Sequence, residues 1–218
     1  NDKKPTVFPG VPAIFNGMNN HKKLGKFDLS SLKYCISGGA PLPVEVKKKF
    51  EEKTGAVVVE GYGLTESSPV LCCNPREGLN KAGSIGMPFP QTIIELIDHK
   101  TGEIVAQGER GELCARGPQV MKGYWNRPDA TAEALDADGW FRTGDIGMMS
   151  EDGMLTIVDR LKDMVIVSGF NVYPNEIEDV AYGHGDIIEC AVVGVADERT
   201  GEAVKLFVVS TNPDLSEQ

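Results

Sequence analysis

The sequence predicts an α/β and α+β protein: the end of a parallel-sheet subdomain, a small antiparallel β-barrel subdomain, and part of a small α+β domain. Three changes of pattern along the chain carry this prediction. Residues 33–59 read as strand, helix and strand, which is a β-α-β unit of a parallel sheet. Residues 83–158 change to short alternating strands with tight turns, which are typical of an antiparallel barrel. Residues 160–218 change again to a strand, a helix that begins at a proline, and two further strands. We therefore expect one domain over residues 1–159, divided into 1–82 and 83–159, and the start of a second over 160–218.

The β-α-β unit is predicted from hydrophobicity and from its breakers. Lys33–Ser37 is a short buried strand, and a helix from Pro43 to Thr54 ends at Gly55. Ala56–Val59 is a continuous apolar run with three valines, typical of a strand buried on both faces. The segments 37–41 and 61–66 then each follow the carboxyl end of a strand, where open α/β sheets bind their ligands.

The remaining elements follow from alternation and turn residues. In the barrel region we expect an Asp98–Gly102 turn between two strands, and an Asp152-Gly153 turn between two others. The expected strands there include Thr92–Ile97, Glu103–Ala106 and Gly111–Arg116. In the last region we expect a helix from Pro174 to about Tyr182, with strands at Met164–Ser168, Glu189–Val195 and Val204–Ser210.

Composition excludes several classes of protein. The 218 residues are 41% hydrophobic and carry a formal net charge of −10, which argues against a nucleic-acid binder and a polybasic membrane anchor. Backbone N–H groups and a metal can still hold small anions on an acidic protein. The five cysteines form no disulfide framework and the three histidines no metal spacing, so we expect reduced, inert thiols in a cytoplasm. No apolar run reaches the ~18 residues of a membrane span.

The segment from Glu60 to Ser67 reads Glu-Gly-Tyr-Gly-Leu-Thr-Glu-Ser. Gly61 and Gly63 allow close approach of a ligand, Tyr62 offers a flat stacking face, and Thr65 and Glu66 are two oxygen donors suited to a magnesium-bound phosphate. A dinucleotide fingerprint is rejected because Glu66 occupies the third glycine position and Pro69 prevents a long helix. A tight turn without a ligand remains the alternative.

Three further positions have two interpretations each. Asp145, at the end of the aromatic-anchored loop 139–145, is either an Asx-turn residue or an acceptor for ribose hydroxyls. The run Asp159–Asp163 is either a solvated linker or a hinge, with Arg160 reaching a nucleotide and Lys162 changing its backbone angles. Gly169 is either a bulge glycine or a point where a ligand passes the backbone.

The order of these motifs resembles the adenylate-forming superfamily of acyl-CoA synthetases, luciferases and peptide-synthetase adenylation domains. The resemblance covers nearly all of residues 8–210 and rests on 37–41, 61–66, 123–125, 139–145 and 159–163. Residues 117–121 and 167–178 are most similar to those of bacterial long-chain fatty acid–CoA ligases. The resemblance implies that residues 1–159 are the C-terminal part of the large adenylation domain and that 160–218 begin the lid domain.

The resemblance also implies an AMP-forming acid–thiol ligase that uses ATP, Mg²⁺ and coenzyme A. A fatty acid carboxylate attacks the α-phosphate, pyrophosphate leaves, and the thiol of coenzyme A displaces AMP from the acyl-adenylate. The implied catalytic residues are Thr65, Glu66 (the Mg²⁺ ligand) and the hinge Lys162. The implied nucleotide and coenzyme A residues are Gly39, Ala40, Pro41, Gly61, Tyr62, Gly63, Thr65, Asp145, Ile157, Arg160 and Gly169.

Two expected parts of that family are not found in the sequence. Residues 1–36 contain no Ser/Thr/Gly-rich phosphate loop, and the catalytic lysine of the smaller domain is not reached by Gln218. We therefore expect an internal fragment that does not form acyl-adenylate by itself. Two other functions stay open: another acid–CoA ligase or adenylating enzyme, and a non-catalytic nucleotide-binding domain. Peripheral association with the inner face of the cell membrane and the oligomeric state are also open.

Overall fold

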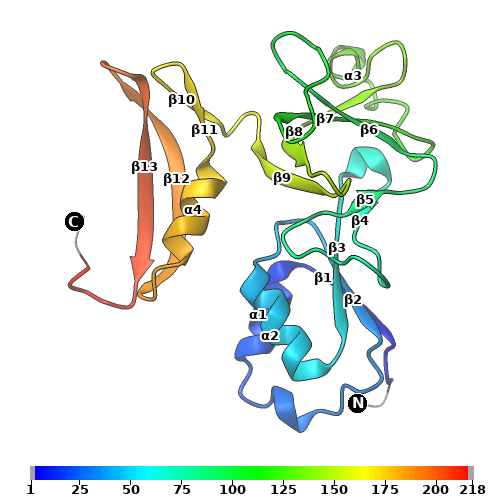
Figure 1. Ribbon diagram of the computed structural model, residues 1–218, viewed down its shortest axis with the longest axis vertical. Coiled ribbons are helices and arrows are strands. Elements are labelled where there is room, and N and C mark those ends of the chain that lie inside the picture. The colour runs from blue at the N-terminus through cyan, green and yellow to red at the C-terminus, as the bar shows by residue number, and fades with distance from the viewer. Residues whose placement is uncertain (1–2, 216–218) are drawn as a thin grey trace. The chain divides into compact units, whose positions relative to one another are not determined.

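The computed structural model describes residues 3–215 and contains two compact units (Figure 1). The first unit comprises Asn1–Thr143 and Met148–Ile157, and the second comprises Gly144–Gly147 and Val158–Gln218. The long strand that contains residues 141–149 therefore supplies residues to both units.

The first unit begins with a mixed five-stranded sheet in the order β1-β2-β3-β4-β5. Strands β1, β2 and β3 are parallel, whereas β4 and β5 are antiparallel to their neighbours. The strands are β1 (Val7–Gly10), β2 (Tyr34–Ser37), β3 (Val57–Gly63), β4 (Val70–Cys73) and β5 (Met87–Pro88). The predicted strand, helix and strand of the β-α-β unit are confirmed. The sequence missed β1, β4 and β5.

Strand β3 corrects one prediction about the glycine segment. Gly61 and Tyr62 do not follow the strand but continue it, because they pair with Cys73 and Cys72 of β4. The parallel partner β2 ends earlier, opposite Glu60. The glycine segment therefore projects beyond the parallel part of the sheet.

Two helices pack together beside this sheet: α1 (Pro12–Asn20), which the sequence missed, and α2 (Val44–Thr54). Phe15 and Phe50 meet edge to face with ring centroids 5.1 Å apart, inside a core that also contains Cys35 and Val58. Helix α2 ends as predicted at Gly55, which has a left-handed φ of 71° that favours glycine. Short 3₁₀ turns lie at η1 (Leu24–Lys26) and η2 (Thr65–Ser67).

The second sheet has the strand order β6-β7-β8-β9, with strands β6 (Ile93–Ile97), β7 (Arg110–Arg116), β8 (Phe141–Met149) and β9 (Leu155–Arg160). The predicted antiparallel character is confirmed for β6 and β7, and the turn at Asp98 is present, because its carbonyl accepts the Gly102 N–H at 2.7 Å. In the described residues the sheet is open and not a closed barrel, because its edge strands β6 and β9 do not pair with each other. The expected strand at 103–106 is reduced to one bridge between Ile104 and Ile97.

Asp145 lies within β8 and not at the end of a loop, which corrects the prediction made from its neighbouring glycines. A short helix that the sequence did not predict, α3 (Pro128–Ala134), precedes this strand.

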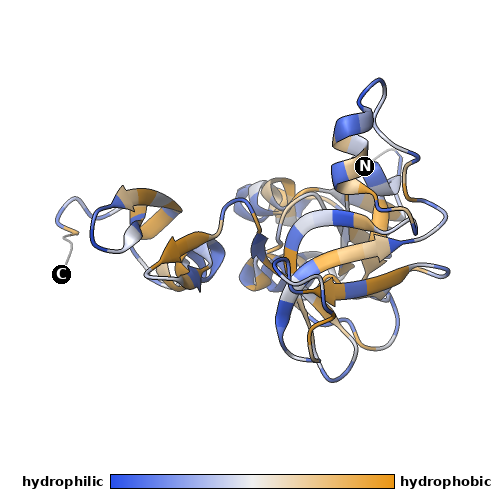
Figure 2. Cartoon of the chain, turned by 90° about the horizontal axis from the view of Figure 1, so that it is seen from above, coloured by the Kyte–Doolittle hydropathy of each residue, from blue (hydrophilic) through white to orange (hydrophobic). Residues whose placement is uncertain are grey.

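The second unit is a four-stranded sheet in the order β11-β10-β13-β12, with helix α4 (Pro174–Tyr182) packed against β12. Its strands are β10 (Val165–Val167), β11 (Phe170–Val172), β12 (Ile187–Asp197) and β13 (Gly201–Ser210). The predicted helix and three of the strands are confirmed, and β11 was missed. Figure 2 shows hydrophobic residues along these strands and hydrophilic ones in the connecting loops.

Candidate functional site

Among the glycines of residues 3–215, an added Cβ would meet another part of the backbone most closely at Gly63, the last residue of β3. A Cβ built at Gly63 would lie 1.7 Å from the Pro69 carbonyl oxygen, so no other residue fits without movement of the backbone. At Gly61 the nearest atom to such a Cβ is the Cys73 sulfur at an ordinary 3.5 Å. The two glycines therefore differ: Gly63 is required by packing within the loop, and packing does not require Gly61.

The loop after β3 is held by the hydroxyl of Ser67, which is fully buried. This hydroxyl accepts the Leu64 N–H at 2.9 Å and donates to the Pro69 carbonyl at 2.7 Å. The exposed Thr65 and half-buried Glu66 are presented at the surface by this internal bond. Our sequence reasoning assigned no role to Ser67, although a serine two residues before a proline favours such a turn.

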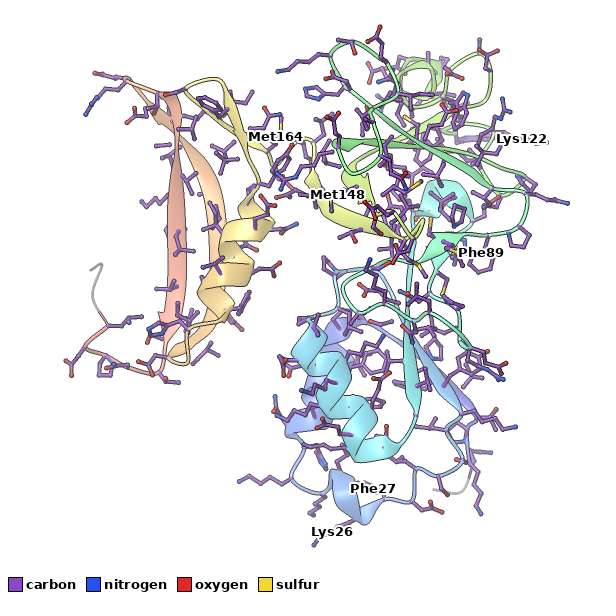
Figure 3. All side chains as sticks on the ribbon, viewed as in Figure 1. Lys26, Phe27, Phe89, Lys122, Met148 and Met164 are labelled. Carbon is purple, nitrogen blue, oxygen red and sulfur yellow. The ribbon has the colours of Figure 1, made fainter. Side chains whose placement is uncertain are left out.

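Glu66 is positioned by a segment 58 residues away in sequence. Its Oε1 accepts a hydrogen bond of 2.8 Å from the Tyr124 hydroxyl, and its backbone carbonyl accepts the Met121 N–H at 2.7 Å. Tyr124 follows the loop labelled at Lys122 in Figure 3. Partial burial, followed by the bond to Glu66, raises the pKa of the tyrosine, which keeps it a donor. In the sequence Tyr124 was noted only as part of the motif 123–125, and its hydrogen bond to Glu66 was not predicted.

A buried carboxylate lies directly before the glycine segment. Glu60 is only 5% exposed, its Oε1 accepts the Leu42 N–H at 3.0 Å, and burial raises its pKa to about 7. Its Oε2 has no hydrogen-bond partner within the described part of the chain, and neither has the hydroxyl of Ser37, its register partner on β2. The side chain therefore joins β3 to the loop that ends at Leu42. No role was predicted for Glu60 from the sequence.

The predicted adenine loop, Gly39-Ala40-Pro41, is the part of that connection that leaves β2. Gly39 has a left-handed φ of 82°, and the Gly38 N–H donates to the Gly10 carbonyl at 3.2 Å. A Cβ at Gly38 would lie 3.2 Å from the Gly61 carbonyl oxygen. The fold thus brings the predicted loops 39–41 and 61–66 side by side.

Tyr62 and Ile157 pack against the same hydrophobic cluster in the first unit, which includes Leu71, Leu113 and Leu155. Both side chains are partly buried, so each presents a surface beyond the core. The fold therefore brings together two residues that lie 95 positions apart and that the sequence assigned to one adenine pocket.

Within the second unit, Asp145 and Arg160 lie on paired hairpin strands. The Leu161 N–H donates to the Gly144 carbonyl at 2.8 Å, and the Arg160 Nε lies 3.8 Å from the Asp145 Oδ1. The Asp145 side chain is 13% exposed and the Arg160 side chain 62% exposed. A largely buried carboxylate beside an exposed cation can accept hydroxyl hydrogen bonds and attract a phosphate.

Within the charged run 159–163, the side chain of Asp159 is hydrogen-bonded inside the fold. It is buried, and its two carboxylate oxygens accept the N–H groups of Arg160 at 2.7 Å and of Asn175 at 3.0 Å. Asn175 lies in the first turn of α4, where a negative charge stabilises free N–H groups. The sequence assigned roles to Arg160 and Lys162 and missed this bond.

Lys162 is exposed in the turn after β9, where the Asp163 N–H donates to the Arg160 carbonyl at 3.1 Å. Ser168 and Gly169, with φ values of 52° and 85°, form the two-residue loop between Val167 and Phe170. Two positive φ values are those of a type I′ hairpin turn, so this turn accounts for the glycine without a ligand.

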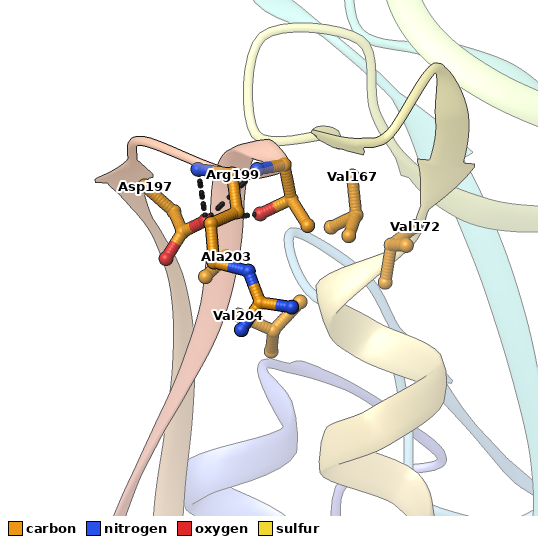
Figure 4. Close-up of a pocket in the computed structure, with 7 residues that line it drawn as sticks. Val167, Val172, Asp197, Arg199, Ala203 and Val204 are labelled. Atoms are coloured by element: carbon orange, nitrogen blue, oxygen red, sulfur yellow. Dashed lines mark hydrogen bonds between the residues drawn. The ribbon is translucent and has the colours of Figure 1, made fainter.

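A shallow hollow of about 520 Å³ lies beside this hairpin (Figure 4). Its lining includes Val167, Val172, Val204 and Arg199. The Asp197 carboxylate closes the adjacent turn by accepting the N–H groups of Arg199 and Thr200, each at 2.9 Å.

The predicted residues thus form two groups, one in each unit. Residues 39–41, Gly61–Glu66 and Ile157 belong to the first unit, whereas Asp145, Arg160, Lys162 and Gly169 belong to the second. Across residues 3–215 there is no cluster of three or more His, Cys, Asp or Glu side chains that could hold a metal by itself.

Comparison with known proteins identifies the family. The family model of AMP-binding enzymes matches residues 1–125, and the model of the AMP-binding enzyme C-terminal domain matches residues 176–218. The chain belongs to the AMP-binding enzyme family. The motifs around Gly61–Glu66 and Tyr124 lie within the first match.

Similar proteins include a long-chain-fatty-acid–CoA ligase of Bacillus subtilis (strain 168), 53% identical over 94% of this chain and 37% of its own length. A feruloyl-CoA synthase of Amycolatopsis sp is 43% identical over 95% of this chain and 42% of its own length. The crystal structure of ATP-bound MatB from Rhodopseudomonas palustris matches with a TM-score of 0.89 and 37% identity, over 94% of this chain and 41% of that one.

The chain therefore spans well under half the length of these relatives. Among residues 3–215, no helix has the length and hydrophobicity needed to cross a membrane.

Proposed function

We propose that this protein is an ATP-dependent long-chain fatty acid–CoA ligase that acts through an acyl-adenylate. The observation that carries the proposal is the 53% identity, over 94% of the chain, to a curated long-chain-fatty-acid–CoA ligase. In the proposed reaction the carboxylate oxygen of the fatty acid bonds to the α-phosphorus of ATP and pyrophosphate leaves. The thiol sulfur of coenzyme A then bonds to the acyl carbon, its proton goes to solvent, and AMP leaves.

In this proposal the first unit binds the base and the phosphates. The ring of Tyr62 stacks on adenine, with Ile157 beside it and Gly39-Ala40-Pro41 along its edge. Gly61 and Gly63 let the nucleotide approach the strand, and the Thr65 hydroxyl donates to a phosphate oxygen. The packing of Tyr62 and Ile157 on one cluster and the adjacency of the two loops support this assignment.

Glu66 fits the requirements of a magnesium ligand. Mg²⁺ usually takes one or two carboxylates and completes its shell with waters and substrate phosphates, so a three-residue cluster is not needed. The bond from Tyr124 occupies Oε1 and orients the carboxylate, which leaves Oε2 for the ion. When bound, the ion would neutralise charge that develops on the phosphoryl oxygens.

In the second unit, we assign the ribose hydroxyls to Asp145 and a ribose or phosphate oxygen to Arg160. Lys162 serves as the hinge at the start of the lid domain, residues 160–218, and the hairpin at Gly169 lies along the path of coenzyme A. The exposed position of Lys162 in a turn supports a hinge, since its backbone angles can change without loss of packing.

The test is AMP formation by the full-length enzyme with ATP, Mg²⁺, coenzyme A and a panel of acids. The proposal expects palmitate to be used with a kcat/KM at least about ten-fold above that for ferulate or malonate. A preference for ferulate would instead favour an aryl-acid ligase, a second candidate supported by the 43% identity to a feruloyl-CoA synthase. Nucleotide binding without AMP formation from any acid would favour a non-catalytic domain.

Long-chain acids partition into membranes, so we place the working enzyme in the cytoplasm and at the inner face of the cell membrane.

A further inference from the structure

The net charge of −10 conceals a strong asymmetry along the chain. Ten of its 22 Lys and Arg residues lie within residues 1–54, whereas only five of its 32 Asp and Glu residues do. The first quarter of this acidic protein is therefore basic. An argument from net charge against a membrane contact does not hold for this part of the molecule.

The fold gathers five of these lysines at one end of helices α1 and α2. The Lys53 ammonium donates to the Asn19 carbonyl at 2.6 Å, and Lys49 donates to the Asn20 side-chain oxygen at 3.4 Å. These bonds connect the last two turns of α2 to the end of α1. Lys22 and Lys23 follow directly after that end of α1. Lys53 and Lys22 line one polar hollow. We call the exposed side chains of Lys22, Lys23, Lys26, Lys49 and Lys53 the basic patch.

An aromatic side chain lies among these lysines. Phe27 is 47% exposed and immediately follows Lys26 on the η1 turn, where both are labelled in Figure 3. The ring of His21 lies 6.3 Å from that of Phe27. A phenylalanine flanked by lysines is the pattern of an interfacial contact, since the ring enters the headgroup boundary while the ammonium groups meet phosphates.

The carboxylates closest to the patch in sequence are fewer than its lysines. Both the N–H and the hydroxyl of Ser30 donate to Asp28 Oδ1, and the Val58 N–H donates to Glu51 Oε1, so these two carboxylates are already engaged within the protein. Glu52 is the remaining exposed carboxylate of the last turns of α2. All three carboxylates keep their negative charge, and the five exposed lysines of the patch outnumber them.

We propose that the basic patch with Phe27 is the surface through which this protein docks on an anionic lipid bilayer. This inference names the surface for the membrane association proposed above. A nucleic acid is disfavoured because the remaining 164 residues carry 12 basic against 27 acidic side chains, which would repel an extended polyanion. A bilayer requires only a local contact, and an exposed phenylalanine adds apolar burial that a phosphate backbone does not offer.

The test measures binding of the full-length protein to vesicles without ATP, acid or coenzyme A. The vesicles are phosphatidylcholine alone, or phosphatidylcholine with roughly one third phosphatidylglycerol, at about 0.1 M and about 0.5 M salt. The key variant is Lys22→Gln/Lys23→Gln/Lys26→Gln. Its matched control, Lys100→Gln/Lys122→Gln/Lys205→Gln, removes the same charge from exposed lysines elsewhere.

The proposal expects binding to the anionic vesicles only, and loss of that binding at high salt. The patch variant should bind about 100-fold more weakly, since each lysine near an anionic surface contributes roughly five-fold, and the control should bind within about two-fold to three-fold of the parent. Phe27→Ser should weaken binding to the anionic vesicles by roughly ten-fold at about 0.1 M salt, because the substitution removes an apolar contribution and no charge.

Equal binding to both vesicle types, or equal loss in the patch variant and the control, would overturn the proposal. Patch-dependent binding to an oligonucleotide or polyglutamate, with none to vesicles, would also overturn it and assign the patch to an acidic macromolecule. Because no substrate is present, failure of this test leaves the ligase proposal intact. An inactive protein that still bound anionic vesicles through the patch would overturn only the ligase proposal.

Discussion

The Glu66 loop and the Asp145–Arg160 hairpin hold their charged groups in different ways. Glu66 is fixed by a phenol at 2.8 Å, on a loop closed by a fully buried serine hydroxyl. Arg160 is mostly exposed and lies 3.8 Å from its carboxylate partner. A preorganised carboxylate suits an ion whose position must not change during reaction, whereas a loosely paired arginine can follow a ligand. Among the residues proposed to bind the nucleotide, we call the Glu66 loop of the first unit the rigid half and the Asp145–Arg160 hairpin of the second unit the adaptable half.

The largest effect should come from Glu66→Gln, which keeps the acceptor for Tyr124 and removes the charge. We expect the rate of fatty-acid-dependent ATP–pyrophosphate exchange in the full-length enzyme to fall about 10²–10³-fold, the cost typical of one preorganised electrostatic group. The exposed Glu103→Gln serves as the control. A loss of less than about five-fold, with unchanged magnesium dependence, would contradict the metal role.

The rigid half can be broken at its backbone by Gly63→Ala, because the added methyl carbon would lie 1.7 Å from the Pro69 carbonyl oxygen. We expect a loss of about 3 kcal/mol in the free energy of unfolding, measured with urea. Gly169→Ala is the matched substitution in the other half. No atom lies within 4 Å of a Cβ built at Gly169, so only the left-handed φ of 85° disfavours alanine there. We expect this substitution to lower the free energy of unfolding by about 1 kcal/mol. Equal losses would mean that contact with Pro69 does not distinguish the two glycines.

The buried Glu60 makes the rigid half sensitive to pH. Its pKa is raised by burial from 4.5 to about 7, so the folded protein binds this proton more tightly than the unfolded chain. Its contribution to stability is complete below pH 4.5 and is lost as the pH rises through about 7, by roughly 3 kcal/mol in total.

The variant Glu60→Gln stays neutral and keeps an acceptor for the Leu42 N–H. The variant's free energy of unfolding, relative to that of the parent, should therefore increase as the pH rises from 4.5 to 7. The exposed Glu52→Gln should follow the parent at every pH. If both variants had the same pH dependence of stability as the parent, ionisation of Glu60 would not destabilise the folded protein.

In the adaptable half, Asp145→Ala should weaken AMP binding by about 10-fold to 100-fold, the usual value of hydrogen bonds to a charged acceptor. Palmitate binding should change less than about two-fold. Calorimetry with each ligand separates the two effects, and Asp138→Ala, an exposed carboxylate that precedes the same strand, is the control. Equal losses for AMP and palmitate would count against a ribose role.

The sequence predicted the helix ends that are set by a residue at the end itself. Helix α2 ends at Gly55 and α4 begins at Pro174, as their breakers indicate. Strand β3 was predicted too short, because the pairing of Gly61 and Tyr62 depends on β4, a strand that the pattern did not reveal. Similarly, Asp145 looked like a turn residue beside a glycine, and only pairing with the strand of Arg160 places it inside a sheet.

The candidate site shows the same limit. Thr65, Glu66 and Arg160 could be selected because their side chains suit phosphate chemistry. Tyr124 and Asp159 could not, since their importance lies in hydrogen bonds to residues brought near by folding. The resemblance to a family supplied the motif around Tyr124 but no partner for its hydroxyl.

The bond between Tyr124 and Glu66 has an optical consequence. The next residue is Trp125, whose side chain is 89% exposed, whereas the other indole, Trp140, lies 5.1 Å under the guanidinium of Arg116. Trp125 emission is therefore set by water and by the conformation of the segment that carries the phenol. A cation bound at Glu66 would change the electric field at the Tyr124 hydroxyl and at the neighbouring Trp125, so we expect Trp125 fluorescence to report metal binding without a label.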